Sequence, residues 1–386
     1  MSNNIDREAV DARIAFSIGT EQRGHADGLF NAPRGLAFDH HRGLLYVVDV
    51  GNYRVQAFSC DDGSFVSKFG SRGLQPGLFQ LSWGLAIDHD HDRIFNIDIG
   101  NNVVLSWSPS EPPFVSWLNL QGSEPLQLSF PQGIAIDKHH RRIIIVDRSS
   151  NRLLFLSSVD LSFLFSVGEQ GSRPGEFFYP SSIAIDDDRH RIIVTDTNNH
   201  RVRVLSLIDG SFLFEFGSYG KQSGELWSPR GVCIDNQGRI IVADSNNDRL
   251  QAFTHEGHHI SSFDRGCRNP FCVAFDEHRG LIAFSTSNRV HVIGANQWLA
   301  DTFTWRPDRH RYAPSWIKQA VLTMTMIRSL VDDSAMSMIP NELLFEVFSW
   351  LEPPELVVEQ PRQQSAVAVS TSDRLHESTT NTCALM

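Results

Sequence analysis

Cysteine is scarce in this sequence, and its spacing is irregular. The 386 residues contain five cysteines: Cys60, Cys233, Cys267, Cys272 and Cys383. An odd number argues against a complete disulfide framework, and no CxxC or CxxxH spacing indicates a zinc site. Cys60, Cys233 and Cys272 occupy apolar segments where an aliphatic residue would also fit. We therefore interpret them as small buried hydrophobic residues in a reducing compartment.

Runs of basic residues and long apolar segments are also absent. The sequence has 34 lysine and arginine residues against 45 aspartate and glutamate residues, for a net charge of −11. The lack of a basic block argues against a surface that tracks phosphates strongly. No apolar run reaches membrane-spanning length, and the polar first 15 residues show no secretory signal. We therefore expect a cytoplasmic protein, and its 41% hydrophobic residues suffice for a sizeable core.

The sequence does contain a long internal repeat. In each copy an aspartate closes a short apolar run, and the first five of these lie 49 residues apart: Asp39, Asp88, Asp137, Asp186 and Asp235. A second aspartate follows each of them: Asp49, Asp98, Asp147, Asp196 and Asp244. A sixth, less regular copy carries Asp276, with Thr286 at the second position. A period of this length is typical of propellers and other repeat architectures.

Each repeat divides into four short apolar segments bounded by turn residues. In the first copy these are 35–39, 44–49, 54–59 and 65–70, and an Asp-Gly pair marks the last hairpin. Six repeats of four antiparallel strands predict an all-β protein, a six-bladed β-propeller.

Two segments are candidates for the strand that closes the ring. Residues 13–19 have the pattern of an isolated fourth strand, so the chain enters in the middle of a repeat. Residues 297–303 fit the same role, and the sequence leaves the choice open.

The consensus of the repeat is specific. It reads Pro-x-Gly-(Ile/Leu)-Ala-(Ile/Phe)-Asp, then an apolar strand ending in Val-x-Asp, then Asn-x-Arg-Val and Asp-Gly-x-Phe. The best copies are 33–70, 180–217 and 229–263. This pattern resembles the NHL repeat, and the resemblance covers residues 13–303. It implies a six-bladed propeller that usually presents a recognition surface, but it does not by itself imply an activity.

The repeated polar residues are interpreted as structural, because a catalytic group is needed only once. The aspartates recur in nearly every copy, and the arginine of the Asn-x-Arg pattern recurs in four: Arg54, Arg152, Arg201 and Arg249. We expect these side chains to hydrogen-bond turn amides and to pair across neighbouring blades.

Histidine is concentrated in the hairpins between the first two strands of the repeats. These hairpins carry His40, His41, His89, His91, His139, His140, His190 and His278. Imidazole can bind metal or respond to pH, and His89-Asp90-His91-Asp92 is the best local candidate. We expect hairpins of different blades to lie too far apart to share one ion. The sequence therefore predicts solvated polar turns, with no metal and no cofactor.

The positions that vary within the regular frame identify a candidate binding face. One set precedes the innermost strands: Arg34, Trp83, Gln132, Ser181, Arg230 and Phe271. The other follows the second strands: Tyr53, Asn102, Asn151, His200 and Asp248. Both sets are expected on one face near the axis, where arginine and aromatic side chains anchor interfaces. The predicted partner-binding residues are Arg34, Tyr53, Trp83, Gln132, His200, Arg230 and Phe271.

These observations favour a non-enzymatic scaffold that binds a protein partner on one face. Propeller enzymes place a metal or a nucleophile in the central channel, with ligands that do not repeat. No singular His, Glu or Asp set stands at the starts of the inner strands here. A propeller hydrolase or lyase with a central-channel site is one alternative. A propeller that binds single-stranded RNA on the same face is another.

The composition changes after residue 303. Residues 304–314 form a polar linker, and apolar positions at helical spacing predict a helical segment over 315–356. Within it, 339–356 resembles the opening of an F-box, which docks a Skp-type adaptor of cullin ubiquitin ligases. The docking residues implied are Leu343, Leu344, Phe348 and Leu351. The later F-box helices have no counterpart, so an amphipathic hairpin that packs on the propeller or self-associates is the rival interpretation.

The F-box resemblance predicts that the segment binds a Skp-type protein through its apolar face. Leu344→Ala combined with Phe348→Ala should remove about 2–4 kcal/mol of binding free energy, the range of hot-spot truncations. Co-purification with a Skp-type protein measures the effect. Binding that survives the double substitution, or that is absent from the wild type, would rule the module out.

The tail 357–386 is rich in serine and threonine and is expected to be disordered. It ends in Cys383-Ala384-Leu385-Met386, a CaaX form whose methionine predicts farnesylation of Cys383. No basic cluster or second cysteine precedes it, so one prenyl chain would give only weak membrane association.

Farnesylation of Cys383 can be tested by measuring the intact mass of the protein purified from eukaryotic cells, for the wild type and for Cys383→Ser. A wild-type protein with an unmodified Cys383 that keeps its last three residues would contradict the prediction.

Overall fold

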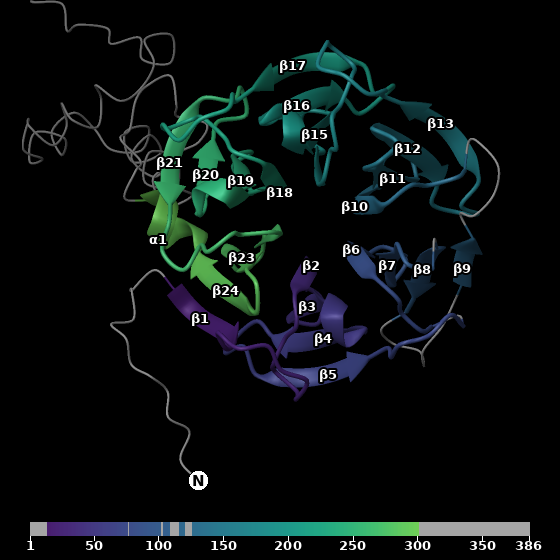
Figure 1. Cartoon of the computed structure of the whole chain (residues 1–386), viewed down its shortest axis with the longest axis vertical. Coiled ribbons are helices and arrows are strands. Elements are labelled where there is room, and N and C mark those ends of the chain that lie inside the picture. The colour runs from purple at the N-terminus through teal and green to yellow at the C-terminus, as the bar shows by residue number, and fades with distance from the viewer. Residues whose placement is uncertain (1–13, 76, 102, 109–115, 120–125, 301–386) are drawn as a thin grey trace, which may run out of the picture. The chain divides into compact units, whose positions relative to one another are not determined.

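The computed structural model describes residues 14–300, except 76, 102, 109–115 and 120–125. In this part of the chain the strands form six four-stranded sheets with antiparallel pairing. Figure 1 shows these sheets as blades arranged around a central axis. The all-β, six-bladed propeller predicted from the repeat is confirmed. No helix in the described ranges has the length and hydrophobicity that crossing a membrane requires.

In the first five blades the four strands follow one another from the axis outward. Blade 1 contains β2 (Pro33–Asp39), β3 (Leu44–Asp49), β4 (Arg54–Ser59) and β5 (Phe65–Phe69). Blade 2 contains β6 (Ser82–Asp88), β7 (Arg93–Asp98), β8 (Val103–Trp107) and β9 (Ser116–Asn119). Blade 3 contains β10 (Pro131–Asp137), β11 (Arg142–Asp147), β12 (Arg152–Ser157) and β13 (Phe163–Val167).

The remaining blades follow the same order. Blade 4 contains β14 (Ile183–Asp186), β15 (Arg191–Asp196), β16 (Arg201–Ser206) and β17 (Phe212–Phe216). Blade 5 contains β18 (Pro229–Ile234), β19 (Ile240–Asp244), β20 (Arg249–Phe253) and β21 (His259–Phe263). Blade 6 contains β22 (Val273–Asp276), β23 (Leu281–Ser285), β24 (Arg289–Gly294) and β1 (Ile14–Gly19). Three single turns of 3-10 helix follow the second strands of blades 1, 4 and 5: η1 (Val50–Asn52), η2 (Thr197–Asn199) and η3 (Ser245–Asn247).

The ring is closed by the first strand of the chain. β1 pairs antiparallel with β24, with Ile18 opposite Val290, and so becomes the outer strand of blade 6. The rival segment, 297–303, begins inside the short helix α1 (Ala295–Ala300), so its described residues form no strand. The structure therefore decides the question that the repeat pattern left open.

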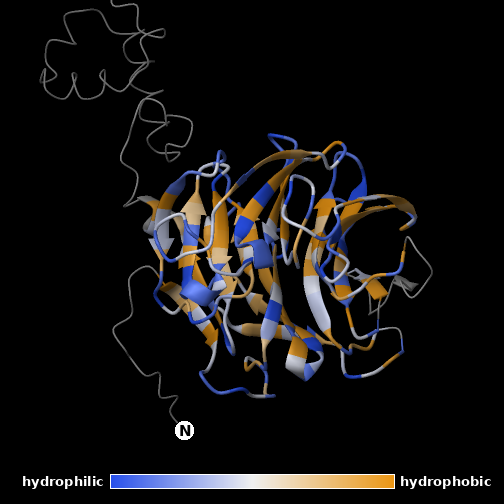
Figure 2. Cartoon of the chain, turned by 45° about the horizontal axis from the view of Figure 1, so that its top comes forward, coloured by the Kyte–Doolittle hydropathy of each residue, from blue (hydrophilic) through white to orange (hydrophobic). Residues whose placement is uncertain are grey.

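The hydrophobic core is divided among the blade junctions. Six clusters of buried side chains each join two neighbouring blades. At the closing junction, Ile18 and Val290 of blade 6 pack with Phe58 of blade 1. Figure 2 shows the corresponding pattern, hydrophobic strands joined by hydrophilic loops. Each fully buried aliphatic or aromatic side chain contributes about 1.5–3 kcal/mol, so neighbouring blades stabilise one another.

The cysteines behave largely as the sequence predicts. Cys60, Cys233 and Cys267 are buried free thiols in these clusters, and Cys272 is half-buried. Burial raises the pKa of the Cys60 thiol to about 12 and that of the Cys272 thiol to about 11. The thiols are therefore protonated and unreactive at neutral pH.

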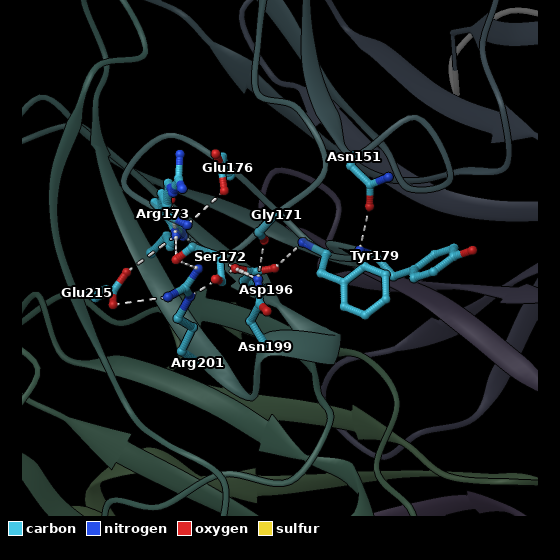
Figure 3. Close-up of polar contacts among 12 residues, drawn as sticks. Asn151, Gly171, Ser172, Arg173, Glu176, Tyr179, Asp196, Asn199, Arg201 and Glu215 are labelled. Carbon is cyan, nitrogen blue, oxygen red and sulfur yellow. Dashed lines mark hydrogen bonds and ion pairs between the residues drawn. The ribbon is translucent and has the colours of Figure 1, made fainter.

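The second aspartate of each of the first five repeats forms a carboxylate clamp, defined here as the buried aspartate and the donors around it. Figure 3 shows the clamp of blade 4. Asp196 is fully buried and accepts hydrogen bonds from the Phe178 backbone N–H at 2.7 Å, from Asn199 at 2.8 Å and from Arg201 Nε at 3.0 Å. Arg201 also donates to the Ser172 carbonyl at 2.8 Å. The clamp therefore ties the turn after β15 to the connector from blade 3.

Blades 1, 3 and 5 use the same arrangement. Arg54 Nε lies 2.9 Å from Asp49, Arg152 Nε lies 3.0 Å from Asp147, and Arg249 Nε lies 2.8 Å from Asp244. Blade 2 has Val103 at the arginine position, and its Asp98 accepts only backbone and asparagine donors among the described residues. The predicted hydrogen bonds from backbone amides to these aspartates are confirmed. The aspartate–arginine pairs, however, lie within one blade and not across neighbouring blades, because each arginine opens the strand that follows its aspartate.

The first aspartate of each repeat stabilises the hairpin that follows the innermost strand. Asp39 accepts a hydrogen bond from the Arg42 backbone N–H at 3.1 Å and another from its guanidinium at 3.0 Å. Asp186 accepts from the Arg189 backbone N–H at 3.2 Å. The carboxylate satisfies turn amides that the strand ladder leaves free.

The C-terminal predictions lie outside the described residues. They comprise the linker 304–314, the helical segment 315–356 with its F-box-like part, and the tail 357–386 with Cys383. They stay predictions.

The clamp predicts a large loss of stability when its carboxylate is removed. Asp196→Ala leaves the guanidinium groups of Arg201 and Arg203 and two further donors without their acceptor, so the free energy of unfolding should fall by about 3–5 kcal/mol. Asp209→Ala is the matched control, because Asp209 is an exposed turn aspartate and its loss should cost about 1 kcal/mol or less. Denaturant unfolding followed by circular dichroism measures both. Equal losses for the two variants would contradict a special role for the clamp.

Candidate functional site

The residues at the starts of the innermost strands converge on the propeller axis. They line a cavity of about 100 Å³. We call it the axial pocket and define it by one residue from each blade: Arg34, Trp83, Gln132, Ser181, Arg230 and Phe271. Six positions that are remote in the sequence thus share one site, as the variation within the repeat predicted.

The carboxylate clamps hold these residues in place. In blade 1 the Asn31 backbone N–H donates to Asp49 at 2.8 Å, three residues before Arg34. In blades 2 to 5 the backbone N–H that donates to the clamp aspartate also lies three residues before the pocket residue. The donors are Gln80 for Trp83, Ser129 for Gln132, Phe178 for Ser181 and Trp227 for Arg230. Each clamp therefore fixes the backbone from which a pocket residue projects.

Glycine after the pocket residue lets the innermost strands approach one another. A Cβ atom on Gly35 would lie 2.2 Å from the Trp83 carbonyl oxygen, and one on Gly84 would lie 2.2 Å from the Gln132 carbonyl oxygen. No side chain tolerates such distances. The Pro-x-Gly motif thus keeps the pocket narrow.

Two arginines and two aromatic rings form the wall of the pocket. The Arg34 guanidinium carbon lies 3.8 Å from the centre of the Phe271 ring, and that of Arg230 lies 4.1 Å from the same centre. Trp83 meets Phe271 edge to face at 5.7 Å. Cation–π contacts hold both guanidinium groups in fixed positions while leaving their N–H donors largely available.

A third arginine, Arg148, was missed by the sequence reasoning. Its Nη1 donates to the Tyr179 carbonyl at 2.9 Å and to the Ser181 hydroxyl at 2.5 Å. It directly follows the clamp residue Asp147, where blades 1 and 2 have Val50 and Ile99. Arg148 is a charged residue at a repeat position that is uncharged in the other blades. This difference could have identified it from the sequence.

The axial pocket is cationic and has no internal counter-ion. Arg34, Arg148 and Arg230 form no ion pair within the described part of the chain. Burial, and to a smaller extent the charge of Arg230, lowers the pKa of Arg34 and of Arg148 to about 10 each. All three nevertheless stay protonated at neutral pH. Because the lining contains no aspartate, glutamate or histidine, the pocket is suited to an anionic group.

Tyr53 and His200 do not line the axial pocket. Both follow a 3-10 turn with positive φ, at 57° and 56°. His200 Nδ1 accepts a hydrogen bond from the Ser228 backbone N–H at 3.0 Å, and the Tyr53 ring lies under the Arg72 guanidinium. Asn151 similarly accepts from the Tyr179 backbone N–H at 2.8 Å (Figure 3). These turn residues contact the connector to the next blade.

The hairpin histidines converge, contrary to the expectation that hairpins of different blades lie too far apart. The ring of His40 from blade 1 lies 3.9 Å from that of His89 in blade 2 and 4.3 Å from that of His278 in blade 6, between centroids. The hairpins follow the innermost strands, which come together at the axis. The His89–Asp92 motif does not act as a unit, because His91 bonds to its own Asp88 at 2.9 Å.

Comparisons of sequence agree with the architecture. A family model described as a 6-bladed beta-propeller matches residues 114–213, and a model of the NHL repeat matches 30–58 and 226–253. No curated protein sequence matches the chain significantly.

Solved structures share the fold at low sequence identity. A gluconolactonase from Xanthomonas campestris is 14% identical, with a TM-score of 0.54 over 68% of this chain and 86% of its own. A protein of unknown function from Bacteroides thetaiotaomicron is 15% identical, with a TM-score of 0.53 over 70% of this chain and 73% of its own. A chain of a nidogen/laminin complex is 15% identical, with a TM-score of 0.50 over 64% and 84%. The family models and the six blades together show that the protein is a six-bladed β-propeller with NHL repeats at 30–58 and 226–253.

Proposed function

We propose that this NHL propeller is a recognition scaffold that binds a protein partner through the axial pocket. The observation that carries the proposal is the pair of guanidinium groups, Arg34 and Arg230, stacked on Phe271 without an acidic neighbour. A carboxylate of the partner would accept hydrogen bonds from both arginines. It would also relieve the repulsion between them.

The size of the pocket favours a side chain or a chain terminus over a whole small molecule. Its volume of about 100 Å³ is well below the roughly 300–1,000 Å³ of most ligand sites. A partner would insert one acidic group and rest its remaining surface on the surrounding loops. Tyr53 and His200, on turns that follow the second strands, then stay candidates for contacts outside the pocket.

The lining argues against the two alternative functions. General acid–base chemistry most often uses an imidazole or a carboxylate, and the lining of the axial pocket has neither. The Cys272 thiol, with its pKa raised to about 11, is a poor nucleophile. Binding of single-stranded RNA usually needs a basic groove that follows the backbone, whereas this positive charge is confined to one pocket of an acidic chain.

A displayed library of random 12-residue peptides, panned against the full chain, tests the proposal. Selected peptides should carry an aspartate, a glutamate or a required free C-terminus. Replacement of that carboxylate by its amide should weaken binding. Arg34→Ala and Arg230→Ala should each weaken it about 10-fold to 100-fold, since a charged hydrogen bond contributes about 1.5–3 kcal/mol.

Arg268→Ala is the matched control, because Arg268 is exposed and lies outside the pocket. It should leave peptide affinity unchanged, and melting temperatures should confirm that all variants fold. Selected peptides that are uncharged, or that bind the pocket variants as tightly as the wild type, would contradict the proposal. Tighter, salt-sensitive binding of an oligouridine 12-mer would favour the RNA alternative.

The ubiquitin-ligase adaptor is the sharper version of this function, and sequence alone supports it. The F-box-like segment, 339–356, would recruit a Skp-type protein while the axial pocket holds a substrate. The Leu344 and Phe348 substitutions test the recruitment. The peptide experiment tests the pocket, so the two parts can fail separately.

A further inference from the structure

Hairpins of three blades bring five potential metal ligands together at the end of the channel opposite the axial pocket. We call this the histidine cluster: His40, His41, His89, Glu277 and His278. Potential ligand atoms of the first three lie within 4.8 Å of one another, and those of His40, Glu277 and His278 do so too. The seven residues of β2 separate the cluster from the axial pocket by about 20 Å.

The imidazole nitrogens of the cluster are not used by the rest of the fold. Those of His40, His41 and His89 form no hydrogen bond with any residue that the structure describes. An oxygen of the buried Asp39 lies 3.9 Å from Nδ1 of His89, beyond hydrogen-bonding distance. Ring–ring contacts account for the packing of the cluster, but they leave these nitrogens without a hydrogen-bond partner among the described residues.

Two imidazoles of the cluster favour the neutral form. Burial, and to a smaller extent the neighbouring His40, lowers the pKa of His89 to about 4. The pKa of His40 is also lowered, by burial and then by His278 and His41. Neutral imidazole offers a lone pair to a metal ion, whereas imidazolium does not.

The cluster does not belong to the repeated frame. The position directly after the first aspartate is histidine in blades 1 and 2, but it is Lys138, Asp187 and Asn236 in blades 3, 4 and 5. The hairpins of those blades form without histidine there, so the turn does not require it. A group that appears once within a regular repeat is a candidate for a specific function.

We propose that His40, His41 and His89 bind one Zn²⁺ ion, with a fourth coordination position open to Glu277, His278 or water. Three imidazole ligands suit zinc and its borderline-soft neighbours, whereas calcium and magnesium prefer oxygen. The ion joins the hairpins of blades 1 and 2 beside the junction where the ring closes. Zinc therefore stabilises the closed ring, independently of whatever the axial pocket binds.

Isothermal titration of ZnCl₂ into the metal-stripped, untagged full chain tests the site. The wild type should bind one equivalent. His40→Ala and His41→Ala should each weaken binding by more than about 100-fold, since even outer-shell substitutions lose about 10-fold to 100-fold. Zinc should raise the melting temperature of the wild type but not that of these variants.

His91→Ala is the matched control, because His91 is on the same hairpin as His89 but bonds to Asp88. It should bind zinc as the wild type does. His41 is exposed, so its substitution tests the site without threatening the fold. A wild type that binds no stoichiometric zinc, a His41→Ala variant of wild-type affinity, or a His91→Ala variant that loses binding would each overturn the proposal.

Discussion

The carboxylate clamp is the interaction on which the rest of the structure depends. A buried aspartate such as Asp196 is costly unless it is fully hydrogen-bonded, and here backbone, asparagine and arginine donors surround it. Its partners come from the connector of the preceding blade and from the turn of its own. The same contact therefore sets the spacing between neighbouring blades. In blades 1–5 it also fixes the strand start that carries the pocket residue.

With the frame held by repeated residues, specificity is left to the positions that differ from blade to blade. These positions lie at the two ends of the innermost strands. One end gathers arginines stacked on aromatic rings and has no counter-charge. The other end gathers half-buried and exposed imidazoles, of which His40 and His89 have lowered pKa values. The two ends of one channel are thus chemically distinct, and they are suited to an anion and to a metal cation.

The junction between blades 6 and 1 is the one at which the two ends of the propeller sequence meet. β1 supplies the outer strand of blade 6, and Ile18 joins the core shared with blade 1. The histidine cluster spans blades 6, 1 and 2 beside this junction. An ion bound by His40, His41 and His89 links blades 1 and 2, and with Glu277 or His278 as fourth ligand it would also link blade 6 to blade 1, which joins distant parts of the chain.

The sequence by itself determined the blades, because strand, turn and clamp patterns are local and recur every 49 residues. It also placed Arg34, Trp83 and Arg230 at equivalent positions of the repeat, so their convergence followed once the ring was inferred. Only the tertiary structure decided that β1 closes the ring, that Arg148 bonds to the pocket residue Ser181 and that His40 meets His89 and His278. These features depend on how closely the innermost strands approach at the axis. That distance is set by packing among all six blades, and no single repeat encodes it.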